Sequence, residues 1–506
     1  MEELFGELES DPCDQRLKGI RVAVVGGGLA GLRAARELGR RGIKATVFEA
    51  RKEWGGRVLS NTTFSNGRIT EEGAELIASF HTRWLALARK YNLTVVSRMD
   101  GHLYERAGLS ERRTLDRPLS LTEMWSVEKE AAKRALFPIA NLAATIEHAD
   151  LPWRQPALKK FDDMSVATAL RKLFKVNPSE RVWKQLIFQL VNTEVAPLEE
   201  MNFLALLCKV KGAQSVKFRS DGPYAKLMRY WNELEIFRSV DGCQEMAVKM
   251  VDEIRTRYGA TVLLKTAVTH IDLSKQRVKV GFKKVILPDG TLAPQPPDVF
   301  LCDYVILAIP PSVWPGVRIT ADGEKAQPEA YIGPQGMGPC GKYFSAMKEP
   351  FWVKEQAAPY GGSLTVGQVW DGTDNQTRVA GQGIVLSVFA GPIVNGPHGA
   401  RAPVPSEFDR GLKQLYRGYA GSLDKTLFTD WPNIPFIKTG YAAPTVGQIF
   451  KIGDKLFKPF RGRLFFAGEH TQMDFFGYME GALRSGERAA RTLIQQACSW
   501  QGTKVA

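Results

Sequence analysis

The sequence predicts an α/β fold in which a parallel sheet is interleaved with a second, mixed sheet and a helical region. Three observations carry this prediction. An apolar strand at 21–25 runs into the glycine turn Gly26–Gly31, and a helix and a second strand at 44–48 follow. Residues 303–310 form a near-continuous apolar run, typical of a buried parallel strand. Residues 463–471 repeat the order of strand and turn, and a helix follows.

Length and composition indicate a globular protein of more than one domain. A chain of 506 residues is too long for a single core. Its hydrophobic share of 44% and charged share of 24% are ordinary. No apolar run reaches the length of about 18 residues that a membrane span needs, and no apolar segment follows the acidic N-terminus, so neither a span nor a secretory signal is predicted.

Charge and cysteine usage exclude several function classes. The net charge of +14 comes from scattered basic residues with acids among them, so nucleic-acid binding is not predicted. Histidines and cysteines are dispersed without metal-ligand spacing, so no metal site is predicted. We expect reduced cysteines in a cytoplasmic protein. The cysteines are Cys13, Cys208, Cys243, Cys302, Cys340 and Cys498.

The glycine turn predicts a dinucleotide-binding unit, because strand, turn, helix, strand and acid follow one another in that order. Gly26 permits the tight turn, and Gly28 lets the backbone approach a pyrophosphate. Gly31 lets the helix and the strand pack closely. The helix begins at Leu29 and Ala30, where free N–H groups and the positive end of the dipole favour phosphate.

The residues after the second strand bear on the choice between NAD and FAD, which the glycine spacing leaves open. Glu49, followed by Ala50, can accept hydrogen bonds from ribose hydroxyls. Gly55-Gly56-Arg57 resembles the signature of FAD proteins of the glutathione-reductase type. In those proteins the glycines let the chain pass close to the cofactor, and the arginine lies near the pyrophosphate. The forked donor group of Arg57 suits two phosphates.

Two further segments give the chain its resemblance to the flavin-dependent amine oxidase family, which extends from Arg21 to Gln496. Lys342 stands six residues before the Lys-Glu-Pro-Phe-Trp run that begins at Lys348. In the family, the lysine at this spacing holds a water against N5 of the flavin. Read alone, this segment is an alternating strand with a turn at Pro350, in which Lys342 would be a structural lysine at a sheet edge. Residues 463–490 match the family almost residue for residue.

The resemblance implies a flavin site made of segments far apart in the sequence. The turn Gly73-Ala74-Glu75-Leu76 lines the flavin edge, and the backbone of Val268 contacts the adenine. Gly468 and Glu469 serve the ribityl or phosphate region, and we expect His470 to be a satisfied structural histidine. The helix that begins at Gly477, Tyr478 and Met479 faces the pyrimidine side, where a helix N-terminus stabilises the negative charge of reduced flavin.

The resemblance also implies a substrate site, with Lys342, Tyr441 and Tyr478 as the catalytic residues. Tyr441 and Tyr478 stand on either side of the substrate nitrogen and guide a neutral amine towards the flavin. We interpret Gln368, Trp370 and Phe351 as pocket-lining residues. Mitochondrial monoamine oxidases attach the flavin through a cysteine just before the first aromatic residue, and Gly440 stands there in this chain. Non-covalent FAD is therefore implied.

Three functions remain open. The first is an L-amino-acid oxidase that converts the Cα–N bond to an imine, then to a 2-oxo acid and ammonia, while O2 becomes H2O2. Snake-venom-type L-amino-acid oxidases clamp the carboxylate with an arginine where this chain has Leu76. The second is a monoamine or polyamine oxidase, which needs no such clamp. The third is a non-catalytic or chromatin-directed protein, because histone demethylases share the fold; it ranks last, since no DNA-binding or helical-tower insertion is visible.

The resemblance suggests a division of the chain into five parts. Residues 20–80, 236–320 and 455–498 form the FAD-binding domain, 81–235 form a helical region over the substrate channel, and 321–454 form the substrate-binding sheet. The expected partners are a small L-amino acid or amine and O2, with neither nucleic acid nor membrane. The family implies a homodimer.

Overall fold

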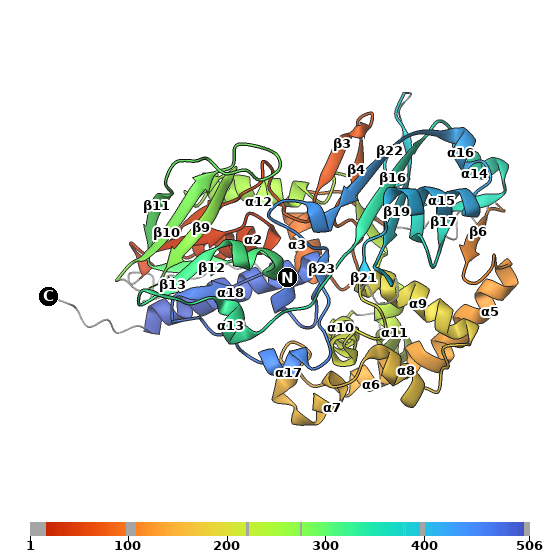
Figure 1. Cartoon of the computed structure of the whole chain (residues 1–506), viewed down its shortest axis with the longest axis horizontal. Coiled ribbons are helices and arrows are strands. Elements are labelled where there is room, and N and C mark those ends of the chain that lie inside the picture. Colours follow the sequence, from red (N-terminus) through yellow and green to blue (C-terminus); the bar gives the residue numbers. More distant parts are fainter. Residues whose placement is uncertain are drawn as a thin grey trace.

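The computed structural model describes residues 17–97, 108–218, 222–273, 276–377, 379, 381–394 and 400–499. A parallel sheet with its covering layers makes one half of the molecule, and a six-stranded mixed sheet lies beside it (Figure 1). Helices gather below the mixed sheet in this view. The predicted α/β fold, with a Rossmann-like part interleaved with a mixed-sheet part, is confirmed.

The parallel sheet collects strands from distant parts of the chain. Its order is β24-β12-β1-β2-β8, and every neighbouring pair runs parallel. After its first two strands the chain therefore leaves this sheet and returns to it three times. The strands are β1 (Arg21–Val25), β2 (Lys44–Phe48), β8 (Thr261–Leu263), β12 (Tyr304–Leu307) and β24 (Leu464–Phe466).

Successive side chains of these strands face two different layers, as the strand period of two requires. In β1, Val22 and Val24 pack against helices, whereas Ala23 and Val25 pack against a second sheet. The helices are α2 (Leu29–Gly39), α3 (Thr82–Lys90), α12 (Glu245–Thr256) and α18 (Met479–Ser499). The second sheet consists, in spatial order, of β11 (Asp298–Cys302), β10 (Val278–Lys284), β9 (Thr266–Asp272), β13 (Arg318–Ala321) and β14 (Glu324–Lys325).

Close packing fixes the start of α2 against β1. Gly26 has φ +111°, and a Cβ there would lie 2.7 Å from the Ala308 carbonyl oxygen. A Cβ on Gly31 would lie 2.0 Å from the Gly26 carbonyl oxygen. Neither position has room for a side chain, so the helix N-terminus is held at the carboxyl edge of the sheet, where nucleotides bind in such folds.

The mixed sheet places the lysine strand in its interior. Its strands, in spatial order, are β22 (Leu423–Asp430), β16 (Gly341–Met347), β19 (Ile384–Ala390), β18 (Gly367–Asp371), β17 (Ala357–Ser363) and β6 (Ser110–Thr114). The interpretation of Lys342 as a sheet-edge residue is wrong, because β16 pairs with β22 on one side and β19 on the other. All seven residues of β16 are buried, because both faces of the strand are covered.

Helices between residues 121 and 233 pack around their own apolar core, which also contains Trp431 and Phe476. They are α5 (Leu121–Ala131), α6 (Phe137–Ala144), α7 (Lys159–Asp162), α8 (Val166–Lys172), α9 (Arg181–Glu194), α10 (Phe203–Ser215) and α11 (Pro223–Glu233). One turn of π-helix, Ala132–Leu136, joins α5 to α6. The five-part division of the chain stays a proposal.

Short elements complete the fold. The two-stranded pairs are β3 (Ser60–Ser65) with β4 (Arg68–Glu71), β5 (Val95–Ser97) with β7 (Phe237–Ser239), β15 (Met337–Gly338) with β23 (Tyr441–Ala442), and β20 (Ile393–Val394) with β21 (Ala400–Arg401). The remaining helices are α13 (Pro328–Ile332), α14 (Phe351–Lys354), α15 (Pro405–Leu415), α16 (Tyr419–Ser422) and α17 (Gln448–Ile452). All five of these helices lie within residues 321–454, which were predicted to form the substrate-binding sheet.

The cysteine expectation needs correction. Cys498 is disulfide-bonded, so the cysteines are not all reduced. Cys208, Cys243, Cys302 and Cys340 are free and buried, and Cys13 lies outside the described residues. Sequence spacing could not reveal the bond, because the fold decides which thiols meet. No helix in the described part of the chain is long and apolar enough to cross a membrane.

Candidate active site

A cavity of about 650 Å³ lies between the parallel sheet and the mixed sheet. The residues predicted to bind the cofactor or the substrate line this cavity, with two exceptions. Gly31 is one of them, and it permits close packing of α2 instead. Phe351, the other exception, packs in the core beside Trp352 and Tyr416. The predicted residues that line the cavity are Gly26, Gly28, Leu29, Ala30, Glu49, Ala50, Gly56, Arg57, Gly73, Ala74, Glu75, Leu76, Val268, Lys342, Gln368, Trp370, Tyr441, Gly468, Glu469, Gly477, Tyr478 and Met479.

The part of the cavity beside α2 fits a dinucleotide. A Cβ on Gly28 would meet no atom closer than 3.7 Å, so this glycine leaves space on the cavity side rather than filling a packed site. Gly28 precedes α2 without a side-chain cap, and the first N–H groups of the helix can therefore bind a phosphate. Glu49 accepts hydrogen bonds from Gly27 N and Arg51 N, both at 2.7 Å, and its remaining lone pairs can accept ribose hydroxyls.

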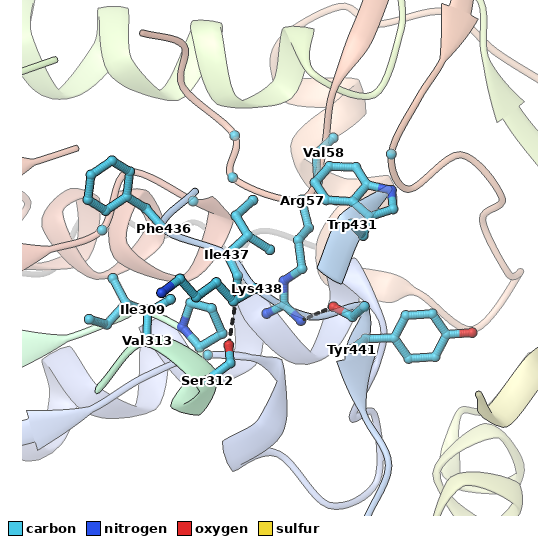
Figure 2. Close-up of a pocket in the computed structure, with 18 of the residues that line it drawn as sticks. Arg57, Val58, Ile309, Ser312, Val313, Trp431, Phe436, Ile437, Lys438 and Tyr441 are labelled. Atoms are coloured by element: carbon cyan, nitrogen blue, oxygen red, sulfur yellow. Dashed lines mark hydrogen bonds between the residues drawn. The ribbon is translucent and has the colours of Figure 1, made fainter. Parts of the chain in front are cut away.

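Arg57 and Glu469 join the two ends of the chain at this cavity. Arg57 Nη1 lies 2.7 Å from Glu469 Oε1. It also donates to the Gly440 carbonyl oxygen at 2.9 Å, the bond drawn as a dashed line beside Tyr441 in Figure 2. Glu469 also accepts from Ala442 N at 3.2 Å and Gly477 N at 2.5 Å. Burial alone would raise the pKa of Glu469, but the Arg57 charge outweighs it and holds the pKa below its usual value. The predicted flavin-binding carboxylate is thus an ionised hub of the site.

The Lys342 ammonium is held by three acceptors at the edge of the cavity. Its Nζ donates to the Glu71 carbonyl oxygen at 2.6 Å, the Gly73 carbonyl oxygen at 3.1 Å and Glu75 Oε2 at 2.8 Å. An ammonium has three hydrogens, so a water can join this lysine only by sharing or replacing one of these bonds. The water-holding role of Lys342 stays a prediction.

Glu75 is the centre of a buried charge cluster that the sequence did not reveal. Its Oε2 accepts from Lys342, while its Oε1 lies 2.9 Å from both Arg238 Nη2 and Trp370 Nε1. Burial alone would raise the pKa of Glu75, but Lys342 and Arg238 together hold it below its usual value. Arg238 also pairs with Asp374. No local pattern marks Arg238 on β7, because its partners Glu75 and Asp374 come from the turn before α3 and from the segment after β18.

Three neighbouring strands of the mixed sheet present one row of side chains to the cavity. Lys342 on β16 is paired with Phe389 on β19, which is paired with Gln368 on β18. All three residues line the cavity. Trp370 lies two residues beyond Gln368 and therefore on the same face of the sheet. The sheet thus fixes the lysine, an aromatic wall and an amide at one end of the cavity.

Tyr441 and Tyr478 lie at this same end. The Tyr441 ring stacks on Phe389 with centroids 6.4 Å apart, and its hydroxyl donates to the Thr193 carbonyl oxygen at 2.9 Å. The Tyr478 hydroxyl lies 2.9 Å from the Tyr230 hydroxyl. Burial raises the pKa of both tyrosines well above the usual value, so both hydroxyls stay neutral. Sequence reasoning missed Phe389 and Thr193, which carry no motif of their own.

An acidic side chain that lines the cavity lies near the tyrosine pair. Glu235 lines the cavity and interacts electrostatically with both Tyr441 and Tyr478. The cavity-lining cations in the described residues are Arg51, Arg57, Lys342 and Lys438. The first three are bound to Gly56, Glu469 and Glu75, respectively. Lys438 is exposed, and the Tyr441 ring points away from it (Figure 2).

His470 is buried and neutral, as expected, but it is not satisfied by hydrogen bonds. Neither ring nitrogen has a hydrogen-bond partner among the described residues. Burial lowers the pKa of His470 to about 3, which leaves the imidazole uncharged at neutral pH. The ring packs edge-on against Trp314, with centroids 5.7 Å apart. The contact with Trp314 thus helps to fix the orientation of the imidazole.

Comparison with known proteins identifies relatives over nearly the whole chain. Residues 29–494 match the family model described as "Flavin containing amine oxidoreductase". The chain is 24% identical to flavin-containing amine oxidase A of Sus scrofa, over 94% of this chain and 85% of the relative. It is 27% identical to the putative flavin-containing monoamine oxidase AofH of Mycobacterium tuberculosis, over 93% and 96%. The structure of wild-type putrescine oxidase bound to putrescine superposes with a TM-score of 0.71 at 19% identity, over 94% and 99%.

A pH-dependent stability is expected from Glu71, whose carboxyl group is buried behind Lys342. Burial raises the pKa of Glu71 from 4.5 to about 7, even though Cys243 N and Ser60 Oγ donate to it at 2.6 and 2.7 Å. The folded state therefore binds this proton more tightly than the unfolded chain. The free energy of unfolding should fall as pH rises from about 4.5 through about 7, by about 3 kcal/mol in total from this group.

Glu71→Gln removes this titration but can keep both hydrogen bonds, because an amide accepts from Cys243 N and donates to Ser60 Oγ. Thermal unfolding from pH 5 to pH 8 should show a smaller decline in Tm for Glu71→Gln than for the parent. Equal declines for the two proteins would show that Glu71 does not titrate in this range.

Proposed function

This chain belongs to the family of flavin-containing amine oxidoreductases, and from that premise we propose that it oxidises amines that carry no carboxylate. The substrate is a monoamine or polyamine, the cofactor is FAD bound without a covalent link, and O2 is the electron acceptor. This is the second of the functions that the sequence left open. It takes precedence over the L-amino-acid oxidase interpretation for reasons of charge.

The observation that carries the proposal is the absence of a cation available to a carboxylate beside the tyrosine pair, among the described residues that line the cavity. A carboxylate that moves from water into a closed site loses its favourable hydration free energy. A positive partner in the site is needed to compensate for this loss. Leu76 stands where the arginine clamp would be, Glu235 adds negative charge, and Lys342 already neutralises Glu75. These charges disfavour an amino acid and favour an amine.

The relatives point in the same direction. Two curated relatives are named as amine or monoamine oxidases, and one solved structure of the same fold holds putrescine. None of these three names refers to an amino acid. The fold by itself cannot select the substrate, so these names support the proposal only alongside the charges of the site.

The chain's residues have distinct parts in this reaction. The flavin, when bound, supplies the oxidation by accepting a hydride equivalent from the carbon next to nitrogen. Tyr441 and Tyr478 present neutral ring faces that orient the amine and exclude bulk water. Lys342 is the residue we propose to hold a water at the flavin edge. Arg57 and the N-terminus of α2 would hold the pyrophosphate.

Non-covalent binding of FAD is supported by the surroundings of Gly440. A Cβ at this position would lie 2.5 Å from Cys340 Sγ and 2.6 Å from the Gly338 carbonyl oxygen, so a cysteine has no room there. Cys340 lines the cavity, but burial raises the pKa of its thiol to about 12. The thiol therefore stays protonated at neutral pH and is a poor nucleophile.

Substrate choice is tested by peroxide release with a panel of L-amino acids, aromatic monoamines, aliphatic monoamines and diamines. We expect peroxide from one or more of the amine groups and none from the L-amino acids, because the described residues at the tyrosine end of the cavity offer a carboxylate no cation that is not already paired. Peroxide from L-amino acids alone would contradict the proposal and restore the first interpretation.

Replacing Lys342 with Met should slow anaerobic flavin reduction or the reoxidation that follows by about tenfold or more, because the positioned ammonium is lost. The flavin should stay bound. Stopped-flow absorbance measures both half-reactions. Lys348→Met is the matched control, since Lys348 is an exposed lysine just beyond the same strand. Unchanged rates in Lys342→Met would remove Lys342 from the catalytic residues.

Acid precipitation tests the mode of attachment. We expect all of the yellow flavin to remain in the supernatant, and mass spectrometry to identify it there as FAD. The reason is that neither Gly440 nor the protonated Cys340 offers a nucleophile for a covalent link. A yellow pellet would contradict non-covalent binding, and peptide mapping would then identify the attached residue.

A further inference from the structure

We propose that the last turn of helix α9, acting with Lys209 and Tyr230, positions both tyrosine rings of the active site. Thr193 holds Tyr441 directly, and Glu194 holds Tyr478 through Tyr230. None of Lys209, Glu194 and Tyr230 carries a recognisable motif, and none of them lines the cavity of about 650 Å³. They are positioning residues, and their assignment rests on the function proposed above for the Tyr441 and Tyr478 pair.

A chain of hydrogen bonds runs from the Tyr478 hydroxyl to a buried carboxylate. The Tyr230 hydroxyl donates to Glu194 Oε1 at 2.6 Å. Because that proton is committed, the Tyr478 hydroxyl must donate to Tyr230 across their 2.9 Å contact. Each hydroxyl thus has one defined direction, and the Tyr478 ring has one preferred orientation.

A buried ammonium completes this chain from outside the cavity. Lys209 Nζ lies 2.7 Å from Glu194 Oε2, and the two side chains are 0% and 2% exposed. The same Nζ lies 4.0 Å from the centre of the Phe476 ring and 4.5 Å from that of Tyr478. Lys209 does not itself line the cavity. Lys209 therefore contacts the Tyr478 ring from outside the cavity lining, through a cation–π interaction.

Tyr441 is bound by Thr193, the residue before Glu194 in the last turn of α9. The Tyr441 hydroxyl donates to the Thr193 carbonyl oxygen, one of the carbonyls that a helix C-terminus leaves without a partner in the helix. Val195 then ends α9 in the left-handed conformation, with φ +47°. Few β-branched residues adopt this conformation, and it persists only where the surroundings impose it.

The helix end is clamped against the strand that carries Tyr441. Gly338 pairs with Tyr441 between β15 and β23. A Cβ on Gly338 would lie 2.1 Å from the Val195 carbonyl oxygen, so only glycine permits this approach. Tyr441 and Tyr478 are 37 residues apart in the chain, yet both are held by the same end of α9. Tyr441 bonds to Thr193, and Tyr478 is connected to Glu194 through Tyr230. A change at this helix end should reach both rings.

Tyr230→Phe tests the proposal with the smallest change. It removes the hydroxyl between Glu194 and Tyr478 and keeps the ring that packs on Trp231 and Phe80. With a saturating amine from the panel, anaerobic flavin reduction should slow by about tenfold, because small displacements of an orienting group cost this much. Flavin content should stay at the parental level.

Tyr419→Phe is the matched control. Tyr419 is equally buried and its hydroxyl bonds to Ser345 Oγ at 2.8 Å, but it does not line the cavity. Slower reduction in Tyr230→Phe than in Tyr419→Phe, at similar Tm, supports positioning. A parental rate in Tyr230→Phe, or an equal loss in both variants, overturns the proposal.

A second variant covers the case in which Tyr230→Phe does not fold. Glu194→Gln combined with Lys209→Met removes both buried charges while the Gln carbonyl still accepts from Tyr230. Since the cation behind Tyr478 is lost, reduction should again slow relative to the parent. A parental rate in this double variant overturns the role of the charge pair.

Visible circular dichroism of the bound flavin separates this proposal from the proposed function. The signal depends on the aromatic rings around the flavin and needs no turnover. If the parent oxidises no amine, the proposed function fails, yet the dichroism of Tyr230→Phe should still differ from that of the parent and of Tyr419→Phe. Identical spectra in all three proteins overturn the positioning role.

Discussion

The buried ion cluster of Lys342, Glu75 and Arg238 is the interaction on which the rest of the site depends. It joins β16 of the mixed sheet to the turn before α3 and to β7, and so it fixes the two sides of the cavity relative to each other. Burying three charges is costly unless each is paired, and removal of Glu75 would leave two cations together in a low-dielectric interior. The cluster therefore ties Lys342, the turn that contains Glu75, and Trp370 to one another.

This constraint also explains the charge of the substrate end. Because Glu75 pairs with Lys342 and Glu469 pairs with Arg57, neither of these two cations is available to a substrate carboxylate. The site proposed for the substrate is lined by the neutral rings of Tyr441, Tyr478 and Phe389 and the amide of Gln368, with Glu235 also in the lining. A shared fold accommodates amines or amino acids according to a few such charges, so specificity must be read from the site.

Much of the fold and of the cofactor site could be predicted from local sequence. The turn Gly26–Gly31, Glu49 and the segment at 463–471 are short motifs whose geometry follows from their own residues. Contacts between distant segments could not be predicted. Arg238, Glu194 and Lys209 have no neighbours in sequence that mark them, and β16 reveals its central place only through its partners on both sides. The same reason accounts for the bonded Cys498, for Phe351 in the core and for His470 held by Trp314.

The most direct measurement of the central claim is anaerobic stopped-flow reduction of the flavin by 2-phenylethylamine and by L-phenylalanine, which differ only in the carboxylate. We expect 2-phenylethylamine to reduce the flavin, and L-phenylalanine at the same concentration to reduce it at least about a hundredfold more slowly. This factor corresponds to the free-energy cost of leaving a charge unpaired in a closed site. Faster reduction by L-phenylalanine would contradict it, and would mean that a cation of the cavity leaves its carboxylate partner to bind the substrate.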